Sequence, residues 1–270
     1  MKLNFDKIGK SVIATAREAG SLIQKERESF TSDQISTKGL HDFVTNVDKA
    51  SEEFIYSKLK NLIPNAGFLA EEQTNEVLGD VYKWIVDPLD GTTNFIHGLY
   101  PYSVSIALLR EDKVILGVIY EVGADEVFYA WEGTPAYCNG NKIKVSKTAL
   151  LKDSLIATGF PYSNFSKLNA FIESMVYFMK NSHGLRRLGS AATDLAYLAR
   201  GDFDAFYEYD LSPWDVAAGV FIVQQAGGKL SDFSGGNDYI FGKEIIASND
   251  LLRDEFYSTI HKFMEDSVSN

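Results

Sequence analysis

One short stretch decides the fold of this chain: Trp84-Ile85-Val86-Asp87-Pro88-Leu89-Asp90-Gly91-Thr92-Thr93-Asn94. Its first three residues are apolar and predict a short buried strand. Pro88 has a fixed φ and no backbone N–H, so we expect Asp87 and Asp90 to leave the sheet in a set geometry. Gly91 then lets the backbone approach a ligand closely. Asp-Pro and Asp-Gly are ordinary turn dipeptides when taken alone, but the whole run predicts a turn that presents two carboxylates together.

The oxygen atoms of this turn predict a site for a hard divalent cation. Two carboxylates, the main-chain carbonyl of Leu89 and the threonine hydroxyls are all hard ligands, and the run contains no Cys or His. Such ligands suit Mg²⁺ or Mn²⁺. The backbone N–H groups after Asp90 would suit a phosphate if they begin a helix.

Three further acidic positions have structural interpretations when each is taken alone. Glu71 and Glu72 follow apolar residues at a probable strand end and point to opposite sides, so only one can readily be a direct ligand. A solvated loop also explains this pair. Asp48 could be the N-cap of a helix, and Asp215 could interact with a helix dipole in a first turn. The residue patterns alone leave these alternatives open.

Five motifs, in order along the chain, resemble those of the Mg²⁺-dependent, lithium-sensitive phosphatases typified by inositol monophosphatase. Besides residues 84–94, they are Asp42-Phe43-Val44-Thr45-Asn46-Val47-Asp48, Glu71-Glu72, Gly189-Ser190-Ala191-Ala192 and Trp214-Asp215-Val216-Ala217-Ala218-Gly219. The resemblance covers nearly all of the chain. It implies a layered α-β-α-β-α sandwich of the sugar phosphatase type.

The resemblance also implies that the acidic positions meet in one site with Thr92. Buried carboxylates are costly unless cations neutralise them, so the combined case for metals is stronger than the case for any single residue. Two overlapping ligand sets are implied: Glu71, Asp87 and the Leu89 carbonyl for one Mg²⁺, and Asp87, Asp90 and Asp215 for a second. Glu71 would also reach a weaker third ion, and Mn²⁺ is a possible substitute.

The same resemblance assigns catalysis to Asp48, Thr92 and Glu71. A water on the first ion, oriented by Thr92 and Asp48, would attack phosphorus in line, with no covalent phosphoenzyme. Substrate contacts are implied for Asp90, Gly91, Thr92, Ser190, Ala191, Glu208 and Asp215. We expect Glu208 to be exposed at a strand end, where it would accept hydrogen bonds from sugar or cyclitol hydroxyls or form a surface salt bridge. Lys38 matches a family lysine only across a one-residue gap and is left as a mobile-loop contact.

Hydrophobic spacing predicts the surrounding elements. Helices are expected at about 4–28 and 48–62, followed by strands between 81 and 145 with a hairpin at Asn139-Gly140. After about residue 146 strands and helices alternate, with strands at 155–158 and 205–208 and near 229 and 245, and helices at 168–180, 190–200, 213–226 and after 249. The sequence therefore predicts an α+β metal-binding lobe at 1–145 and an α/β lobe at 146–270 that completes the active site, joined in one compact unit.

Composition limits the function further. The 270 residues, 45% of them hydrophobic, can bury a large core. The net charge of -11 argues against a nucleic-acid partner, and Arg186-Arg187 is interpreted as a solvated or interface pair. The single cysteine, Cys138, is expected in the core of a protein from a reducing compartment. No signal peptide or apolar run of roughly 20 residues is present, so we expect a soluble cytoplasmic protein without a membrane partner. The family default is a homodimer.

The predicted function is Mg²⁺-dependent hydrolysis of a small polyol phosphate monoester, with myo-inositol monophosphate as the leading substrate. Fructose-1,6-bisphosphatase or NADP phosphatase activity is the alternative on the same metal core. Thr93-Asn94 stand where relatives that act on 3'-phosphonucleotides tend to carry Lys-Glu, which counts against that branch. The competing class is a non-catalytic regulatory or interaction member of the fold, which could lose metal ligands at no cost to its role.

Overall fold

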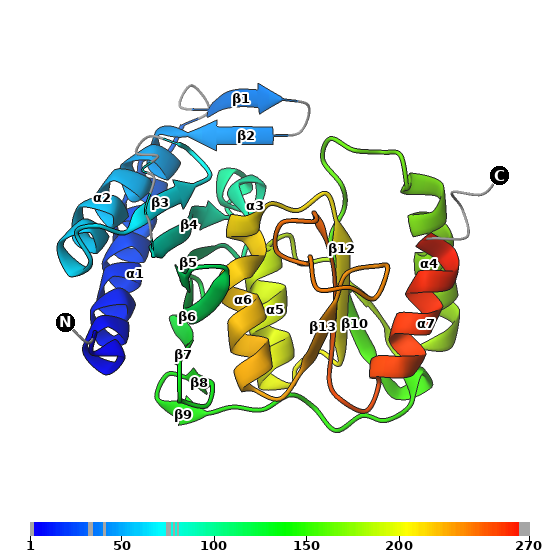
Figure 1. Cartoon of the computed structure of the whole chain (residues 1–270). Coiled ribbons are helices and arrows are strands. Elements are labelled where there is room, and N and C mark those ends of the chain that lie inside the picture. The colour runs from blue at the N-terminus through cyan, green and yellow to red at the C-terminus, as the bar shows by residue number, and fades with distance from the viewer. Residues whose placement is uncertain are drawn as a thin grey trace.

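The computed structural model describes residues 3–31, 35–39, 42–73, 77, 79 and 81–264, and it has five layers (Figure 1). Two helices cover one face of a seven-stranded sheet, two helices lie between this sheet and a five-stranded sheet, and two more cover the outer face of the second sheet. These helix pairs are α1 (Phe5–Glu28) with α2 (Asn46–Leu62), α5 (Ala191–Arg200) with α6 (Pro213–Gln225), and α4 (Leu168–Asn181) with α7 (Arg253–Met264). The predicted α-β-α-β-α sandwich is confirmed.

The seven-stranded sheet has the order β3-β4-β5-β6-β7-β8-β9, with only β3 parallel to its neighbour. The strands are β3 (Gly67–Ala70), β4 (Tyr82–Asp90), β5 (Ser103–Arg110), β6 (Lys113–Glu121), β7 (Glu126–Trp131), β8 (Tyr137–Cys138) and β9 (Asn141–Lys142). Cys138 pairs with Asn141, which confirms the predicted two-residue hairpin. The strand before the acidic turn is longer than predicted. It continues to Asp90 through an irregularity in its pairing with β5 between Asp87 and Asp90.

The five-stranded sheet has the order β11-β10-β12-β14-β13 and is mixed, because β10 is parallel to both neighbours whereas β14 is antiparallel to both of its own. Its strands are β10 (Leu155–Thr158), β11 (Gly184–Arg186), β12 (Ala205–Tyr209), β13 (Lys229–Ser231) and β14 (Glu244–Ser248). The elements that the sequence did not predict are short: the hairpin β1 (Ile35–Gly39) and β2 (Asp42–Thr45), helix α3 (Thr92–His97), strand β11 and a 3-10 turn at Leu151–Asp153. The division into lobes near residue 145 stays a prediction.

Helix α6 is the central element that places the site. Residues 216–223 of this helix are all buried, as expected for a helix that is apolar on every side. It lies directly against β6, where a Cβ atom on Gly117 would be 2.5 Å from the carbonyl oxygen of Ala218. Only glycine permits this approach. The N-terminus of α6 is thereby brought to the end of β4.

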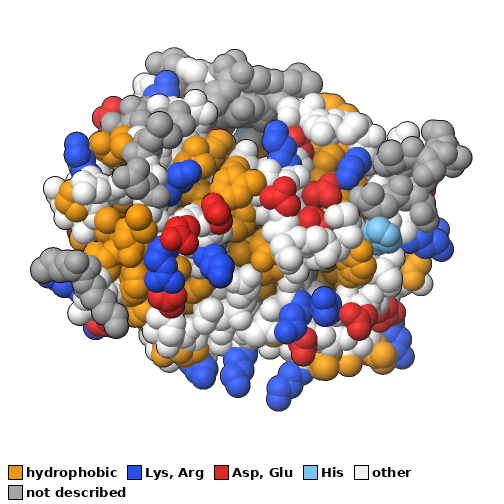
Figure 2. Space-filling model, viewed as in Figure 1, with side chains coloured by type: hydrophobic (Ala, Val, Ile, Leu, Met, Phe, Trp, Pro, Cys, Tyr) orange, Lys and Arg blue, Asp and Glu red, His pale blue; other side chains and the backbone are white. Residues whose placement is uncertain are grey.

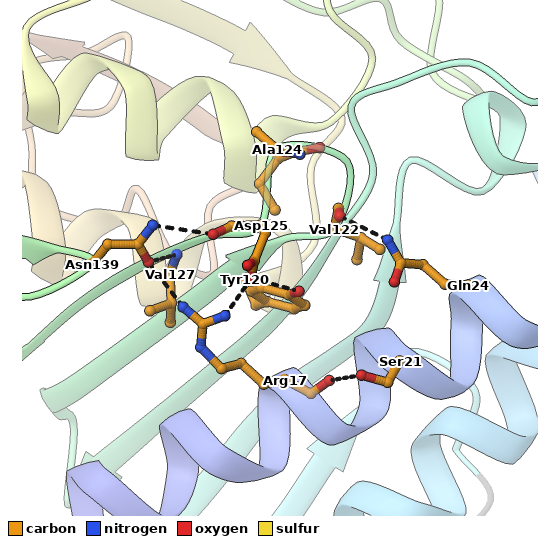
Figure 3. A network of polar contacts seen from close by, with 10 residues as sticks. Arg17, Ser21, Gln24, Tyr120, Val122, Ala124, Asp125, Val127 and Asn139 are labelled. Atoms are coloured by element: carbon orange, nitrogen blue, oxygen red, sulfur yellow. Dashed lines mark hydrogen bonds and ion pairs between the residues drawn. The ribbon is translucent and has the colours of Figure 1, made fainter.

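The Arg17 side chain links helix α1 to the seven-stranded sheet (Figure 3). Its guanidinium forms an ion pair with Asp125, donates to Asn139 Oδ1 at 2.9 Å and lies 5.2 Å from the ring centroid of Tyr120. Tyr120 also donates to Asp125 at 3.0 Å. The network joins α1 to β6, to the turn before β7 and to the turn between β8 and β9, so it stabilises the outer layer without contacting the acidic turn.

The surface is mixed in character. Figure 2 shows acidic and basic side chains scattered over the face that it displays, with hydrophobic side chains exposed between them.

None of the helices in the described part of the chain has the length and apolarity that a membrane crossing requires. Cys138 is buried, as predicted.

Candidate metal centre and active site

Three carboxylates from distant parts of the chain converge at the end of β4. Asp87 and Asp90 come from that strand, and Asp215 comes from the first turn of α6. One ligand atom from each lies within 4.8 Å of the others. The structure therefore brings together the residues predicted for the second metal ion.

Asp90 is held by the beginning of α5. Its Oδ2 atom accepts a hydrogen bond from the Ser190 hydroxyl at 2.5 Å and from the Ala192 N–H at 2.9 Å. Ser190 is the N-cap of the helix, and its hydroxyl also accepts from the Thr193 N–H at 3.2 Å. The motif Gly189-Ser190-Ala191-Ala192 thus positions a predicted metal ligand, and three of its residues also line a neighbouring pocket.

Backbone N–H groups orient the other two carboxylates. The Leu89 N–H donates to Asp87 Oδ1 at 2.9 Å, and the Ser212 N–H donates to Asp215 Oδ2 at 2.7 Å. Asp215 is the acidic member of a capping box with Ser212. An interaction with the helix dipole and metal binding were the alternative explanations of Asp215. Its position in the first turn of α6 allows both, because the carboxylate that accepts from Ser212 has a second oxygen atom.

The electrostatics of the cluster demand a positive charge. The pKa of Asp87 is raised well above its usual range by burial and by the charges of Glu71, Asp90 and Asp215. Burial raises the pKa of Asp90 to about 6, although Ser190 and backbone N–H groups oppose the shift. Burial and the Asp90 charge raise the pKa of Asp215 to about 7. An all-oxygen donor set that is buried and mutually repulsive fits hard divalent cations such as Mg²⁺.

The cluster lines a cavity of about 350 Å³, and the remaining predicted ligands line the same cavity. Glu71, at the end of β3, lines it, as do Leu89, Gly91 and Thr92. Lys243, which the sequence analysis did not select, contributes a cation to the same wall. It lies in the turn before β14 with a φ of 66°.

Asp48 lies behind Thr92 and is fully buried. The Thr92 hydroxyl donates to Asp48 Oδ1 at 3.1 Å and to the Leu89 carbonyl at 3.0 Å. The N-cap of α2 is Thr45 rather than Asp48, which corrects the alternative interpretation of Asp48. Asp48 is instead the acidic partner in the capping box, and it accepts from the Thr45 N–H and hydroxyl at 2.8 and 2.6 Å.

A smaller inner pocket of about 60 Å³ lies beside the metal cavity and shares Asp90 and Asp215 with it. Ser190, Ala191 and Glu208 line this pocket, as the resemblance implied for the substrate side. The expected exposure of Glu208 is wrong, because the residue is only 5% exposed. Gly159 covers it so closely that a Cβ atom there would be 1.9 Å from Glu208 Oε1. Burial first, and then the Asp194 charge, raise the pKa of Glu208 well above its usual range.

Sequence reasoning missed two further groups of the inner pocket. Asp194 of α5 lines it, and so does Arg187, whose Nη2 atom donates to the Tyr162 hydroxyl at 3.1 Å. Arg187 is therefore more than a solvated or interface residue. One feature of the sequence could have indicated Asp194: it is the only acidic residue of a predicted helix that is otherwise mostly small and apolar. The side chain of Lys38 lies outside the described part of the structure.

Comparison with known proteins identifies the family of this chain. Residues 5–266 match the model of the inositol monophosphatase family. The chain is 37% identical over 253 residues to an inositol-1-monophosphatase of Mesorhizobium japonicum, covering 93% of this chain and 95% of the relative. It is 40% identical over 240 residues to the Nus factor SuhB of Escherichia coli K12, covering 88% and 89%. The crystal structure of the extragenic suppressor protein suhB from Bartonella henselae matches with a TM-score of 0.90 at 38% identity, covering 95% of this chain and 99% of that chain. The chain therefore belongs to the inositol monophosphatase family.

Proposed function

We propose that this protein hydrolyses a small polyol phosphate monoester with the help of Mg²⁺, and that myo-inositol monophosphate is its leading substrate. The observation that carries the proposal is the cluster of Asp87, Asp90 and Asp215, whose ligand atoms lie within 4.8 Å of one another beside a cavity of about 350 Å³. Cations held by such a cluster would attract a phosphate group despite the acidity of the protein. A cavity of this size suits a small ligand.

The proposed metal ligands form two overlapping sets. Glu71, Asp87 and the Leu89 carbonyl would hold one Mg²⁺, and Asp87, Asp90 and Asp215 would hold the second. All five line the same cavity. Glu71 would also contribute to a weaker third site, with Mn²⁺ as the possible substitute. When bound, the ions supply charge that neutralises the phosphate and lowers the pKa of a water molecule.

Asp48 and Thr92 are proposed to orient the attacking water, with Glu71 as the third catalytic residue. Thr92 lines the cavity, and its hydroxyl proton points toward Asp48 Oδ1 and the Leu89 carbonyl. The Thr92 oxygen is then left to accept a hydrogen bond from the water. The Thr92 hydroxyl would take the proton that the water loses while it passes its own proton to Asp48 Oδ1, and burial already raises the pKa of Asp48.

The phosphate would be bound by the backbone N–H groups of Gly91 and Thr92. Gly91 has a φ of 89°, and a Cβ atom there would meet the carbonyl oxygens of Pro101 and Gly189 at 3.1 and 3.2 Å. Glycine is thus required for the turn that presents these groups. Ser190, Ala191 and Glu208 would border the alcohol half of the ester, together with Asp90 and Asp215.

Phosphate release from a panel of esters tests the proposal. The panel contains myo-inositol 1-phosphate, fructose 1,6-bisphosphate and NADP, each with Mg²⁺ and with EDTA. We expect Mg²⁺-dependent turnover with the highest kcat/KM for the inositol ester. A preference for the bisphosphate or for NADP would replace the substrate while keeping the metal chemistry. No phosphate release from any ester with Mg²⁺ or Mn²⁺ would refute the proposal.

A second function, from another class, is favoured by one observation: the relative at 40% identity carries the name Nus factor SuhB. A regulatory or interaction role would not require a complete set of carboxylates. Asp87→Asn distinguishes the two functions in cells that depend on this protein. A protein that acts only through interactions would keep its cellular role with this substitution. Loss of that cellular role together with turnover would support catalysis.

We further propose a cytoplasmic homodimer, with the two halves of each chain acting as one catalytic unit. Helix α4 presents an apolar stripe on the surface, formed by Ile172, Val176 and Met179 at 48%, 38% and 57% exposure. Residues three and four positions apart share one helix face, and an exposed stripe of this kind suits a second copy of the chain. Light scattering coupled to size-exclusion chromatography decides this: Met179→Glu should give monomers, and a parent protein that is already monomeric would contradict the proposal.

A further inference from the structure

The inner pocket contains two charged side chains that each keep one buried polar atom without a hydrogen-bond partner among the described residues. Asp194 is 1% exposed, and its Oδ1 atom has no partner in the described structure. The Nε atom of Arg187 is likewise buried without a partner among the described residues. Glu208, which is only 5% exposed, lines the same pocket. Buried polar atoms are almost always paired, so this concentration indicates that a ligand or ordered water completes the pocket.

Helix α5 connects this pocket rigidly to the metal cluster. Ser190 and Asp194 are four residues apart and therefore lie on the same side of the helix. Ser190 holds Asp90 at 2.5 Å. Ala191 and Ala192 lie between them and are small, so the helix can pass close to the site. A group that enters the pocket is thus placed at a set position relative to the metal ligands.

The size and charges of the pocket select the kind of group that it can take. A volume of about 60 Å³ has room for a few water-sized groups. Arg187 adds a positive charge to a lining that is otherwise acidic, so the pocket offers a hydrogen-bond donor as well as acceptors. A neutral hydroxyl group suits it well, because a hydroxyl donates to a carboxylate and accepts from a guanidinium.

We propose that Asp194 is a specificity-determining residue: with Arg187 and Glu208, it binds a hydroxyl group of the alcohol half of the ester, close to the phosphate-bearing carbon. This inference rests on the proposed phosphatase function and narrows its substrate class to esters of alcohols with neighbouring hydroxyl groups. A pocket built to hydrogen-bond a hydroxyl rejects an analogue that lacks it, because its polar groups then stay buried and unpaired.

The test compares two esters that share a ring, myo-inositol 1-phosphate and cyclohexyl phosphate. The quantity measured is the ratio of their kcat/KM values. Asp194→Asn should lower this ratio about tenfold to hundredfold, the loss expected for one charge-assisted hydrogen bond. Inhibition of cyclohexyl phosphate hydrolysis by free myo-inositol should weaken in parallel. The matched control is Asp202→Asn, which removes the same charge beyond the other end of α5, and it should leave the ratio at the parent value.

Two outcomes overturn the inference. If Asp194→Asn keeps the parent kcat/KM for both esters, Asp194 binds only water. If kcat/KM falls equally for both esters, so that their ratio is again unchanged, Asp194 supports the fold or the metal cluster. Arg187→Gln, on a different segment, should lower the same ratio and decides the matter if Asp194→Asn folds poorly. A parent enzyme that hydrolyses neither ester would refute the proposed function instead, so the two failures are distinguishable.

Discussion

The variant Asp87→Asn should be more stable than the parent protein without Mg²⁺ and less stable than the parent with Mg²⁺. Asp87 is 1% exposed, and its ligand atom lies within 4.8 Å of those of Asp90 and Asp215. Two unit charges at such a distance repel by about 3 kcal/mol at an effective dielectric constant near 20. Proton uptake by the cluster relieves part of this repulsion, so we expect the substitution to stabilise the metal-free protein by about 1 to 3 kcal/mol. Asparagine also keeps the Oδ1 acceptor for the Leu89 N–H.

With Mg²⁺ the order should invert. An ion present at a hundred times its dissociation constant stabilises the folded state by about 2.7 kcal/mol, and the variant has lost the carboxylate proposed to bridge both ions. Melting curves of the two proteins in EDTA and in saturating Mg²⁺ measure this directly. At about 2 to 4 °C per kcal/mol for a protein near this size, the variant should melt several degrees higher in EDTA and lower in Mg²⁺. Turnover should be almost abolished.

The reasoning would fail in either of two ways. A variant that melts well below the parent in EDTA would show that the Asp87 charge supports the fold. A variant with the parent's response to Mg²⁺ and substantial residual turnover would remove Asp87 from the metal site. Asp202→Asn serves again as the matched control, since it changes the net charge equally at an exposed position.

Three further predictions concern inhibition by Li⁺, the pH dependence of stability and the Arg17 network. LiCl should inhibit turnover more strongly than matched NaCl, and more deeply as substrate rises, if Li⁺ replaces the ion proposed at Asp90 and Asp215; equal effects of the two salts would rule this out. In EDTA, stability should increase as the pH falls from 8 toward 5, because folding raises the pKa values of Asp90 and Asp215 to about 6 and 7 and the folded state then binds more protons than the unfolded one; the opposite slope would contradict the burial argument. Arg17→Ala should lower the melting temperature and leave kcat/KM unchanged, because its bonds to Asp125 and Asn139 hold only the outer layer (Figure 3); a matched loss in Lys10→Ala, which removes an exposed pair within one helix, would show that the network has no special role.

The sequence by itself determined most of the elements and the chemical character of the site. Apolar spacing and turn residues act locally, so α1, α4 and α5 and the hairpin at Asn139-Gly140 were predicted within a residue or two. The pair Asp87 and Asp90 is also local, since only two residues separate them at the end of one strand. Motif resemblance supplied the remaining ligands and the layered fold, which periodicity could not supply.

Only the tertiary structure decided which distant groups meet and how deeply they are buried. Asp215 reaches Asp87 because α6 lies against β6 at Gly117, a contact between segments about a hundred residues apart. Glu208 is at a strand end, which usually means exposure, but the backbone at Gly159 covers it. Thr45 occupies the N-cap position that was one alternative for Asp48, and Asp48 accepts a hydrogen bond from Thr92. Burial, charge repulsion and unpaired polar atoms depend on neighbours from other segments. The inner pocket and the role proposed for its acid on α5 therefore become visible only when the chain is folded.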